Sequence, residues 1–441
     1  MERTPVNSWN SLHHQTPLMS TNSPFFFPSS SPHLIRMANS DTGVFGAVGA
    51  VLGYVGAEAA TLQIFERLLW PQRAYANATL KSMPMLALLM PMGGPLHSAA
   101  LKALDVMFTH GLFKGARVGH MLGTAFFPDP NWTYTSWASN GQKIKTEPVR
   151  NCLWVRALSY VPIPMLSSEA EEPNAGKIRA KVAVSHLTFA KATKYDINST
   201  MPFVKADIGR PTLRVFLAVF TTELSAVLVA TGTAVYYKSF WALWWLAPLL
   251  LRLVSALFAI DRKPLVSLKL PPPDDPTCDF EIHCPQYEGN FMLLTGPKSV
   301  TEQFFVHYGH PERNRFLETI QLAMVVLFGS LFPLGLFFSV MWMPIGIQKV
   351  WLCYQFYCGL AMIVMRYSHG DSGTSTEAMI AENFRKQEIE PTVIGEKKEA
   401  AILFGITREG DETMKVIFVP SYHNRFMEGQ ECMNTLLGRN P

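Results

Sequence analysis

The most constraining feature of this sequence is the stretch 319–365, whose 47 residues carry a single charge, Lys349. A Pro-Ile-Gly break at 344–346 divides it into apolar halves of 23 residues (319–341) and 19 residues (347–365). Because a helix rises about 1.5 Å per residue, each half can cross a hydrocarbon core of about 30 Å. The stretch therefore predicts a transmembrane hairpin.

The composition agrees with a membrane-associated chain. Hydrophobic residues make up 48% and charged residues 16%, whereas about a quarter of the residues in soluble domains are charged. The net charge of +4 is small, and no basic run alternates with aromatic residues, which argues against nucleic acid as a partner. The six cysteines are scattered and predict no disulfide framework.

A second hairpin is predicted over 212–260, with its turn at Tyr237-Lys238 and one charge in each arm, Glu223 and Arg252. Both lie fourteen and a half residues from the centre of the turn, which is about 22 Å along a helix. An isolated charge at that depth costs at least about 2.5–3.5 kcal/mol, and a paired one costs much less. We expect an ion pair; the alternative is that Arg252 extends to the headgroups while Glu223 is protonated or hydrogen-bonded.

The N-terminal region contains four glycines on one face of a possible helix, Gly46, Gly49, Gly53 and Gly56. Glycines at this spacing allow close packing of membrane helices, so a helix that ends near residue 62 is expected, with a mobile loop as the alternative. The next apolar stretch, 83–96, is interrupted by prolines and glycines and fits a re-entrant, an interfacial or a soluble core segment.

The polar segments differ in charge. Residues 143–214 carry a formal +6 and the tail, 367–441, a formal −4. Alternating patterns predict strands at 178–184, 280–284, 291–295, 400–407 and 414–419. Opposite charges attract within about 8 Å in physiological salt, so we expect the tail hairpin to pack on the basic segment, beside the strand within 177–189.

These patterns give a multi-pass α-helical membrane protein: two transmembrane hairpins, a third N-terminal membrane element left open, and a small α+β cytosolic portion. The expected divisions are a disordered arm (1–41), a Gly-rich apolar region (42–130), a basic soluble segment (131–211), hairpin 1 (212–260), a loop with short strands (261–318), hairpin 2 (319–366) and a tail with a helix and a β-hairpin (367–441).

No catalytic motif is present, so we predict neither catalytic residues nor a cofactor, and enzymatic activity is left open. The best zinc candidates are Cys278, His283, Cys284, His307 and His310. Strand geometry would place His283 and Cys284 on opposite faces, so no metal site is predicted. Gln355 lies inside a predicted span, where an interhelical hydrogen bond explains it.

Charge bias predicts the orientation. Eight basic residues flank the spans on the large side, whereas Lys238 and Lys349 lie in the turns, so the large side is predicted to be cytosolic. The eight are Arg210, Arg214, Arg262, Lys263, Lys269, Arg313, Arg315 and Arg366. Three glycosylation sequons, at Asn77, Asn131 and Asn198, argue for the opposite orientation but are a number expected by chance.

The expected function is that of an integral membrane protein that anchors or organises, with a cytosolic portion that binds a partner protein. The alternative is a small oligomeric transporter or a membrane-embedded lipid-active enzyme. The expected partners are the lipid bilayer, anionic lipid headgroups, an unspecified protein and further copies of the chain.

Overall fold

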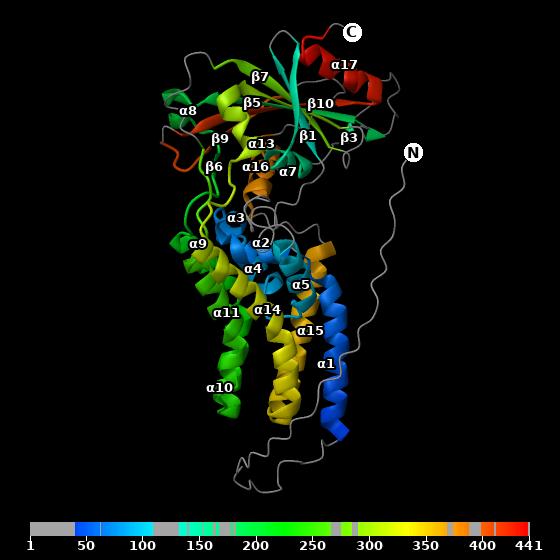
Figure 1. Cartoon of the computed structure of the whole chain (residues 1–441), viewed down its shortest axis with the longest axis vertical. Helices are drawn as coiled ribbons and strands as arrows, with labels where there is room; N and C mark the ends of the chain where they lie inside the picture. The colour runs from blue at the N-terminus through cyan, green and yellow to red at the C-terminus, as the bar shows by residue number, and fades with distance from the viewer. Residues whose placement is uncertain are drawn as a thin grey trace, which may run out of the picture.

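The computed structural model describes residues 40–61, 63–108, 132–138, 141–151, 153–161, 165–166, 178–179, 182–265, 275–284, 290–367, 374–387, 398–409 and 412–439. The predicted disordered arm lies outside these ranges apart from its last two residues. The chain forms two stacked parts, a sheet layer and a helical bundle (Figure 1). The chain passes between the sheet layer and the bundle several times, so strands of the sheet and helices of the bundle alternate along the sequence.

The sheet layer is built on one eight-stranded mixed sheet with the order β2-β1-β7-β8-β5-β10-β9-β6. Its strands are β1 (Thr133–Ala138), β2 (Lys143–Pro148), β5 (Val182–Lys191), β6 (Phe203–Lys205), β7 (Thr277–His283), β8 (Phe291–Pro297), β9 (Ala400–Gly405) and β10 (Met414–His423). The β5–β8 and β6–β9 pairs are parallel and the other pairs are antiparallel. A separate two-stranded sheet pairs β3 (Met165–Leu166) with β4 (Ile178–Arg179).

This sheet overturns the predicted fold class. The chain is not a multi-pass helical membrane protein with a small soluble portion, because its largest unit is the mixed α/β sheet layer. The prediction failed because the strands come from segments far apart in the chain, and each segment alone carries only a short alternating pattern. Backbone pairing across these distances is what makes them one sheet.

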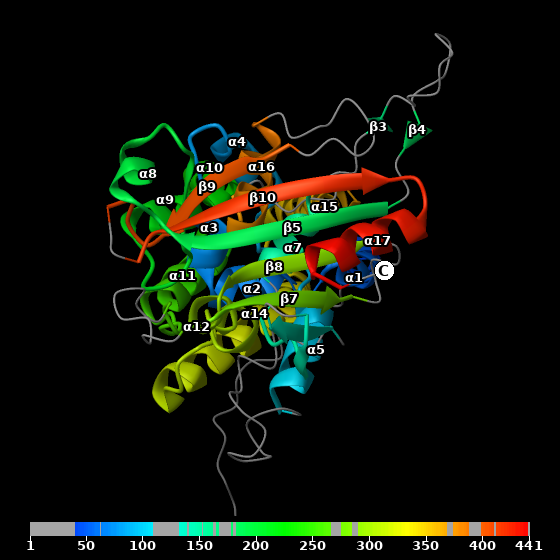
Figure 2. The same ribbon diagram turned by 90° about the horizontal axis from the view of Figure 1, so that it is seen from above.

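Helices cover the two faces of the sheet unequally. On the face toward the bundle lie α7 (Leu153–Ser159), α12 (Lys298–Thr301), α13 (Gln303–Val306) and α16 (Thr376–Arg385). Their side chains close the main core with inward residues such as Phe189, Phe280 and Phe404. On the outer face α17 (Phe426–Leu436) crosses one half of the sheet, over β5 and β8 (Figure 2). The short helix α8 (Lys194–Asn198) follows β5 in the sequence and leads to the edge strand β6.

The tail hairpin packs where the sequence predicts. β10 pairs antiparallel with β5 over ten residues, from Met414 opposite Lys191 to His423 opposite Val182. This prediction is confirmed. The strand predicted over 178–184 is divided in the structure: Ile178 and Arg179 form β4, whereas Val182, Ala183 and Val184, all buried, begin β5.

The bundle consists of the apolar helices. They are α1 (Ser40–Ala59), α2 (Gln63–Leu69), α3 (Pro71–Tyr75), α4 (Met83–Leu89), α5 (His97–Met107), α9 (Leu213–Thr222), α10 (Leu224–Tyr237), α11 (Ala242–Leu257), α14 (Arg315–Met341) and α15 (Ile345–Tyr367). Within the described residues, α14 and α15 are each long and apolar enough to cross a membrane. The number rises to four only if the bent pairs α1 with α2 and α9 with α10 each count as one span.

The region 212–260 is therefore not the regular transmembrane hairpin that its composition predicts. The first arm breaks at Glu223, where α9 and α10 meet at 57°. The second arm, α11, has 16 residues and contains Pro248, so it is about 24 Å long. Composition alone did not reveal the break because Glu223 also fits inside a helix.

Candidate functional site

A buried ion pair lies near the centre of the bundle. Arg252 Nη1 lies 2.8 Å from Glu223 Oε1, and both side chains are almost fully buried. The same Nη1 atom donates to Thr222 Oγ1 at 2.6 Å, and Arg252 Nη2 donates to Tyr75 Oη at 2.8 Å. The structure thus brings together the two charges that the sequence analysis matched by depth, and it adds hydroxyl groups from α9 and α3.

The Met90–Leu96 segment passes through the middle of the bundle beside this pair. Met92 N donates to Glu223 Oε1 at 3.0 Å, and Arg252 Nη1 lies 3.4 Å from Met90 O. Gln355 Nε2 donates to Gly93 O at 3.0 Å, so its partner is this non-helical segment. An irregular backbone needs such partners when water is excluded.

Glycines allow this segment to lie close to α15. A Cβ atom on Gly94 would lie 2.9 Å from Cys358 Cβ, and one on Gly93 would lie 3.0 Å from the Tyr354 ring. The broken apolar stretch 83–96, which the sequence leaves unassigned, is the short helix α4 followed by a packed non-helical segment. The close approach explains why glycine occupies both positions.

The glycine face of α1 is turned inward. Added Cβ atoms would lie 3.3 Å from Val340 at Gly46, 2.7 Å from Leu336 at Gly49, 2.4 Å from Phe332 at Gly53 and 2.2 Å from Pro95 at Gly56. The four glycines thus bring α1 against α14, α15 and the segment before α5. Residues without a large side chain allow helices to pack this closely.

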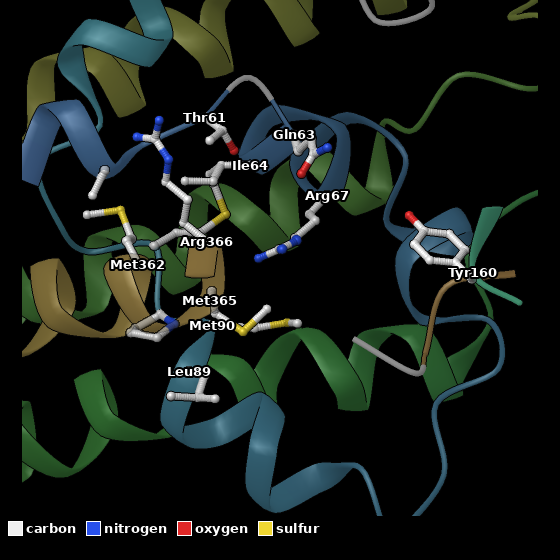
Figure 3. Close-up of a pocket in the computed structure, with 13 residues that line it drawn as sticks. Thr61, Gln63, Ile64, Arg67, Leu89, Met90, Tyr160, Met362, Met365 and Arg366 are labelled. Atoms are coloured by element: carbon white, nitrogen blue, oxygen red, sulfur yellow. The ribbon is translucent and has the colours of Figure 1, made fainter. Parts of the chain in front are cut away.

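Met90, Pro91 and Met92, whose backbone contacts the ion pair, also line a cavity of about 270 Å³. It lies where the bundle meets the sheet layer, between the α1–α2 turn, α4 and the last turns of α15 (Figure 3). The described lining residues are Ala59, Thr61, Gln63, Ile64, Arg67, Leu89, Met90, Pro91, Met92, Tyr160, Met362, Met365 and Arg366. Four methionines and two arginines therefore meet in one cavity.

The polar groups of this cavity are cationic or neutral. The side chain of Arg67 extends among the labelled lining residues, whereas that of Arg366 extends toward the end of α1, where its Nη1 donates to Glu58 O. Among the residues described, no hydrogen bond or ion pair involves the Arg67 guanidinium, and no carboxylate lines the cavity. The site is an electropositive pocket with a thioether wall.

Two further buried ion pairs join the bundle to the sheet layer. The Arg73 guanidinium of α3 pairs with the Glu377 carboxylate of α16, and Arg262 Nη1 lies 2.8 Å from Asp207 Oδ2. Burial alone would lower the pKa of Arg73, but the carboxylates of Glu377, Glu66 and Asp207 outweigh it and raise the pKa. The space between these groups holds almost no free volume, so the cluster is a structural joint.

The outer face of the sheet carries a chain of hydrogen bonds. His186 Nε2 lies 2.9 Å from Thr295 Oγ1, which donates to Asp279 Oδ1 at 2.5 Å. The three side chains come from adjacent strands, β5, β8 and β7. Because the hydroxyl proton already binds the carboxylate, this arrangement does not prepare Thr295 to attack a substrate through His186.

The residues weighed as zinc ligands are separated. Cys278 is buried in the main core, whereas the ring of His283, at the other end of β7, faces Thr135 on the neighbouring strand. His310 Nε2 lies 3.1 Å from Arg150 O. Burial lowers the pKa of His307, and nearby Lys263 lowers it further. In the described part of the chain no three His, Cys, Asp or Glu residues gather as metal ligands.

Sequence reasoning missed the cavity. It named Arg366 only as a flanking charge and did not single out Arg67, since isolated arginines at helix ends are common. The available signal was the Pro-Met-Gly-Gly-Pro run at 91–95, whose glycines mark a close backbone approach.

In comparisons with known proteins, no family model, no curated protein and no solved structure matches the chain. The fold and the cavity define it as an α/β protein with two candidate membrane helices.

Proposed function

We propose that this chain is a membrane-anchored binding protein, in which the α14–α15 hairpin is inserted in a lipid bilayer and the sheet layer lies at one membrane surface. The observation that carries the proposal is the distribution of exposed apolar side chains. On α14 and α15, large side chains such as Leu334, Phe337 and Phe356 are exposed. Among the described strands of the sheet, Ile144 is the only large apolar residue whose side chain is exposed. Exposed large apolar side chains on helices long enough to cross a membrane favour a membrane contact.

Aromatic residues gather at the end of the bundle that lies away from the sheet. Phe338 has its ring centroid 5.1 Å from Trp244, 5.4 Å from Trp342 and 5.9 Å from Trp241. These residues adjoin the α10–α11 and α14–α15 turns. Tryptophan and tyrosine favour the headgroup region, so this aromatic cluster fits the far membrane surface.

The sheet layer is proposed to lie on the cytosolic side. Arg262 and Arg210 do not support this orientation as free flanking charges, because they pair with Asp207 and Asp261. The bias toward the sheet side persists in Arg214, Lys263 and Arg313, against Lys238 and Lys349 at the two turns. Of the sequons, Asn77 is buried and hydrogen-bonded to Lys205 O, so it is not an accessible acceptor in the folded chain.

Alkaline carbonate extraction of membranes that carry the full-length protein tests the anchor. The protein should stay in the membrane pellet, and a variant with Leu334→Lys and Phe356→Lys, two exposed positions, should be released. Matched substitutions at exposed sheet-layer positions, Ile144→Lys and Tyr195→Lys, should have no effect. Release of the unmodified protein by carbonate would refute the anchor.

Labelling with a membrane-impermeant maleimide tests the orientation. In a cysteine-free background, Tyr195→Cys should react in sealed vesicles that expose the cytosolic face, and Lys238→Cys should react only after detergent is added. The reverse pattern, or a shift in gel mobility after peptide-N-glycosidase treatment, would refute the proposed orientation.

A further inference from the structure

We propose that the cavity beside Met90-Pro91-Met92 binds the phosphate-bearing headgroup of an anionic lipid. This inference rests on the proposed membrane anchor, because the cavity lies between the apolar helices and the sheet layer. With α14–α15 inserted, that position corresponds to the headgroup region on the sheet side. A lipid in the same leaflet can reach the cavity without leaving the bilayer.

The cations of the cavity define the chemistry of the headgroup. Arg67 has no hydrogen bond or ion pair with any described residue. Arg366 donates one hydrogen bond, from Nη1 to Glu58 O. A guanidinium presents parallel N–H groups that match two phosphate oxygens, and it stays charged at any physiological pH. With no carboxylate among the described lining residues to neutralise them, the two arginines favour an anion.

The rest of the lining suits an amphiphile. Thr61 and Gln63 add neutral polar groups near the arginines, while Met90, Met362 and Met365 contribute thioethers (Figure 3). Met92 adds a fourth thioether to the lining. Methionine side chains adapt to irregular apolar shapes. A soluble anion such as inorganic phosphate has no apolar group to pack on these thioethers, whereas the glycerol and first acyl carbons of a lipid would pack on them.

The size of the cavity limits what enters it. Pockets that enclose a whole drug-sized ligand hold about 300–1,000 Å³, and this cavity holds about 270 Å³. It therefore accommodates a headgroup and the first carbons, with the acyl chains left in the bilayer. Basic pockets between membrane helices bind acidic lipid headgroups in this way.

Glu223 and Arg252 act on this site as positioning residues. They hold the cavity wall from behind, through Met92 N on Glu223 and Met90 O on Arg252. Neither side chain lines the cavity. The buried ion pair would therefore fix the shape of the wall without touching the ligand.

The test measures lipid binding by the full-length protein in detergent, by native mass spectrometry, with phosphatidylglycerol and phosphatidylcholine as probes. Phosphatidylglycerol should be retained in preference to phosphatidylcholine. Arg67→Gln should weaken that binding about tenfold or more, which corresponds to the loss of a charge-assisted hydrogen bond. Arg67→Lys should weaken it less, because the charge is kept. The matched control is Arg214→Gln, an exposed arginine of the same bundle outside the cavity, which should bind as the unmodified protein does.

Two further probes distinguish the sources of the anion. Glycerol 3-phosphate offers the phosphate without acyl chains, and oleate offers a carboxylate with an acyl chain. Both should bind more weakly than phosphatidylglycerol. Equal binding of glycerol 3-phosphate would show a soluble phosphate site, and equal binding of oleate would show a site without phosphate preference; either result overturns the proposal.

The same variants are examined by carbonate extraction, which separates this inference from the membrane anchor. Arg67→Gln should remain in the membrane pellet, so that lost binding cannot be attributed to lost insertion. If the protein is anchored but Arg67→Gln and Arg214→Gln bind phosphatidylglycerol equally, the headgroup site is refuted and the anchor stands. If the unmodified protein is released by carbonate, the anchor itself fails.

Discussion

Arg252 Nη1 of α11 lies 2.8 Å from Glu223 Oε1 at the bend between α9 and α10, and Met92 N donates to the same carboxylate oxygen. The pair therefore does two things. It neutralises two buried charges, and it fixes the non-helical segment that forms the wall of the cavity. Because Arg252 also donates to Thr222 and Tyr75, it has more polar partners than Glu223.

The first prediction concerns the two halves of this pair. Removing one member of a buried ion pair typically costs about 3–5 kcal/mol, because the other charge is left buried. Arg252→Gln should destabilise the protein by this amount, and Glu223→Gln by less, since the guanidinium keeps Thr222, Tyr75 and Met90 O. Equilibrium denaturation of the full-length protein in mixed micelles measures both. In the double variant, the loss in free energy of unfolding should be much smaller than the sum of the losses in the two single variants. Equality with that sum would mean that the two charges do not interact.

The second prediction concerns the glycine face of α1. A Cβ on Gly53 would lie 2.4 Å from Phe332 Cε1, and this ring is held between His97 and Trp351. Gly53→Ala should therefore destabilise the protein by about 1–3 kcal/mol, the usual range for an overfilled core.

Gly43→Ala is the matched control on the same helix, because nothing lies within 4 Å of its added Cβ. It should be neutral or stabilise by up to about 1 kcal/mol through helix propensity. Thermal unfolding of both variants in the same detergent gives the comparison. Equal effects would mean that α1 does not pack through its glycines.

The third prediction concerns pH and Asp196 at the start of α8. Hydrogen bonds from the Thr193 side chain, Lys415 Nζ and the Thr193 backbone lower the pKa of the Asp196 carboxyl to about 2. A carboxyl with a depressed pKa in the folded state stabilises the fold above its unfolded pKa, which is about 3.9. That stabilisation is lost as the pH falls from about 4 to about 2.

Hydrogen exchange of the α8 amides measures this local effect. Their protection should decrease between pH 4 and pH 2, after correction for the intrinsic exchange rate. In Asp196→Asn, protection should already be low at pH 7 and should change little over that interval. An unchanged acid transition in this variant would assign the effect to another carboxyl.

The fourth prediction concerns the joint between the two parts of the molecule. Glu377→Gln removes the carboxylate that pairs with buried Arg73, so we expect a loss of about 3–5 kcal/mol. Glu382→Gln on the same helix breaks an exposed pair with Lys386, and such pairs contribute about 0.5 kcal/mol or less. Denaturation curves that coincide for the two variants would show that the joint contributes no more than a surface contact.

Several elements could be predicted from local sequence because their signal is local. The stretch 319–365 is covered by α14 and α15, which extend beyond it to Arg315 and Tyr367 and are separated at Pro344, since length and apolarity alone select long helices. The strand pattern at 291–295 lies within β8, and the pattern at 280–284 overlaps β7, which begins at Thr277 and ends at His283. The fold class was wrong in part because the strand signal of β1 and β2, between residues 133 and 148, is weak: β2 contains Lys143, Lys145 and Glu147 and a single large apolar residue, Ile144.

The sequence by itself determined where long apolar helices form, which glycines share a face of α1, and that Glu223 and Arg252 lie at matching distances from a turn. These properties depend on helical periodicity and on distance along the chain. Only the tertiary structure decided that eight strands from distant segments form one sheet, that α9 and α10 bend at Glu223, and that Arg67 and Arg366 meet at one cavity. These outcomes depend on backbone hydrogen bonds and packing between residues far apart in sequence, which no local pattern specifies.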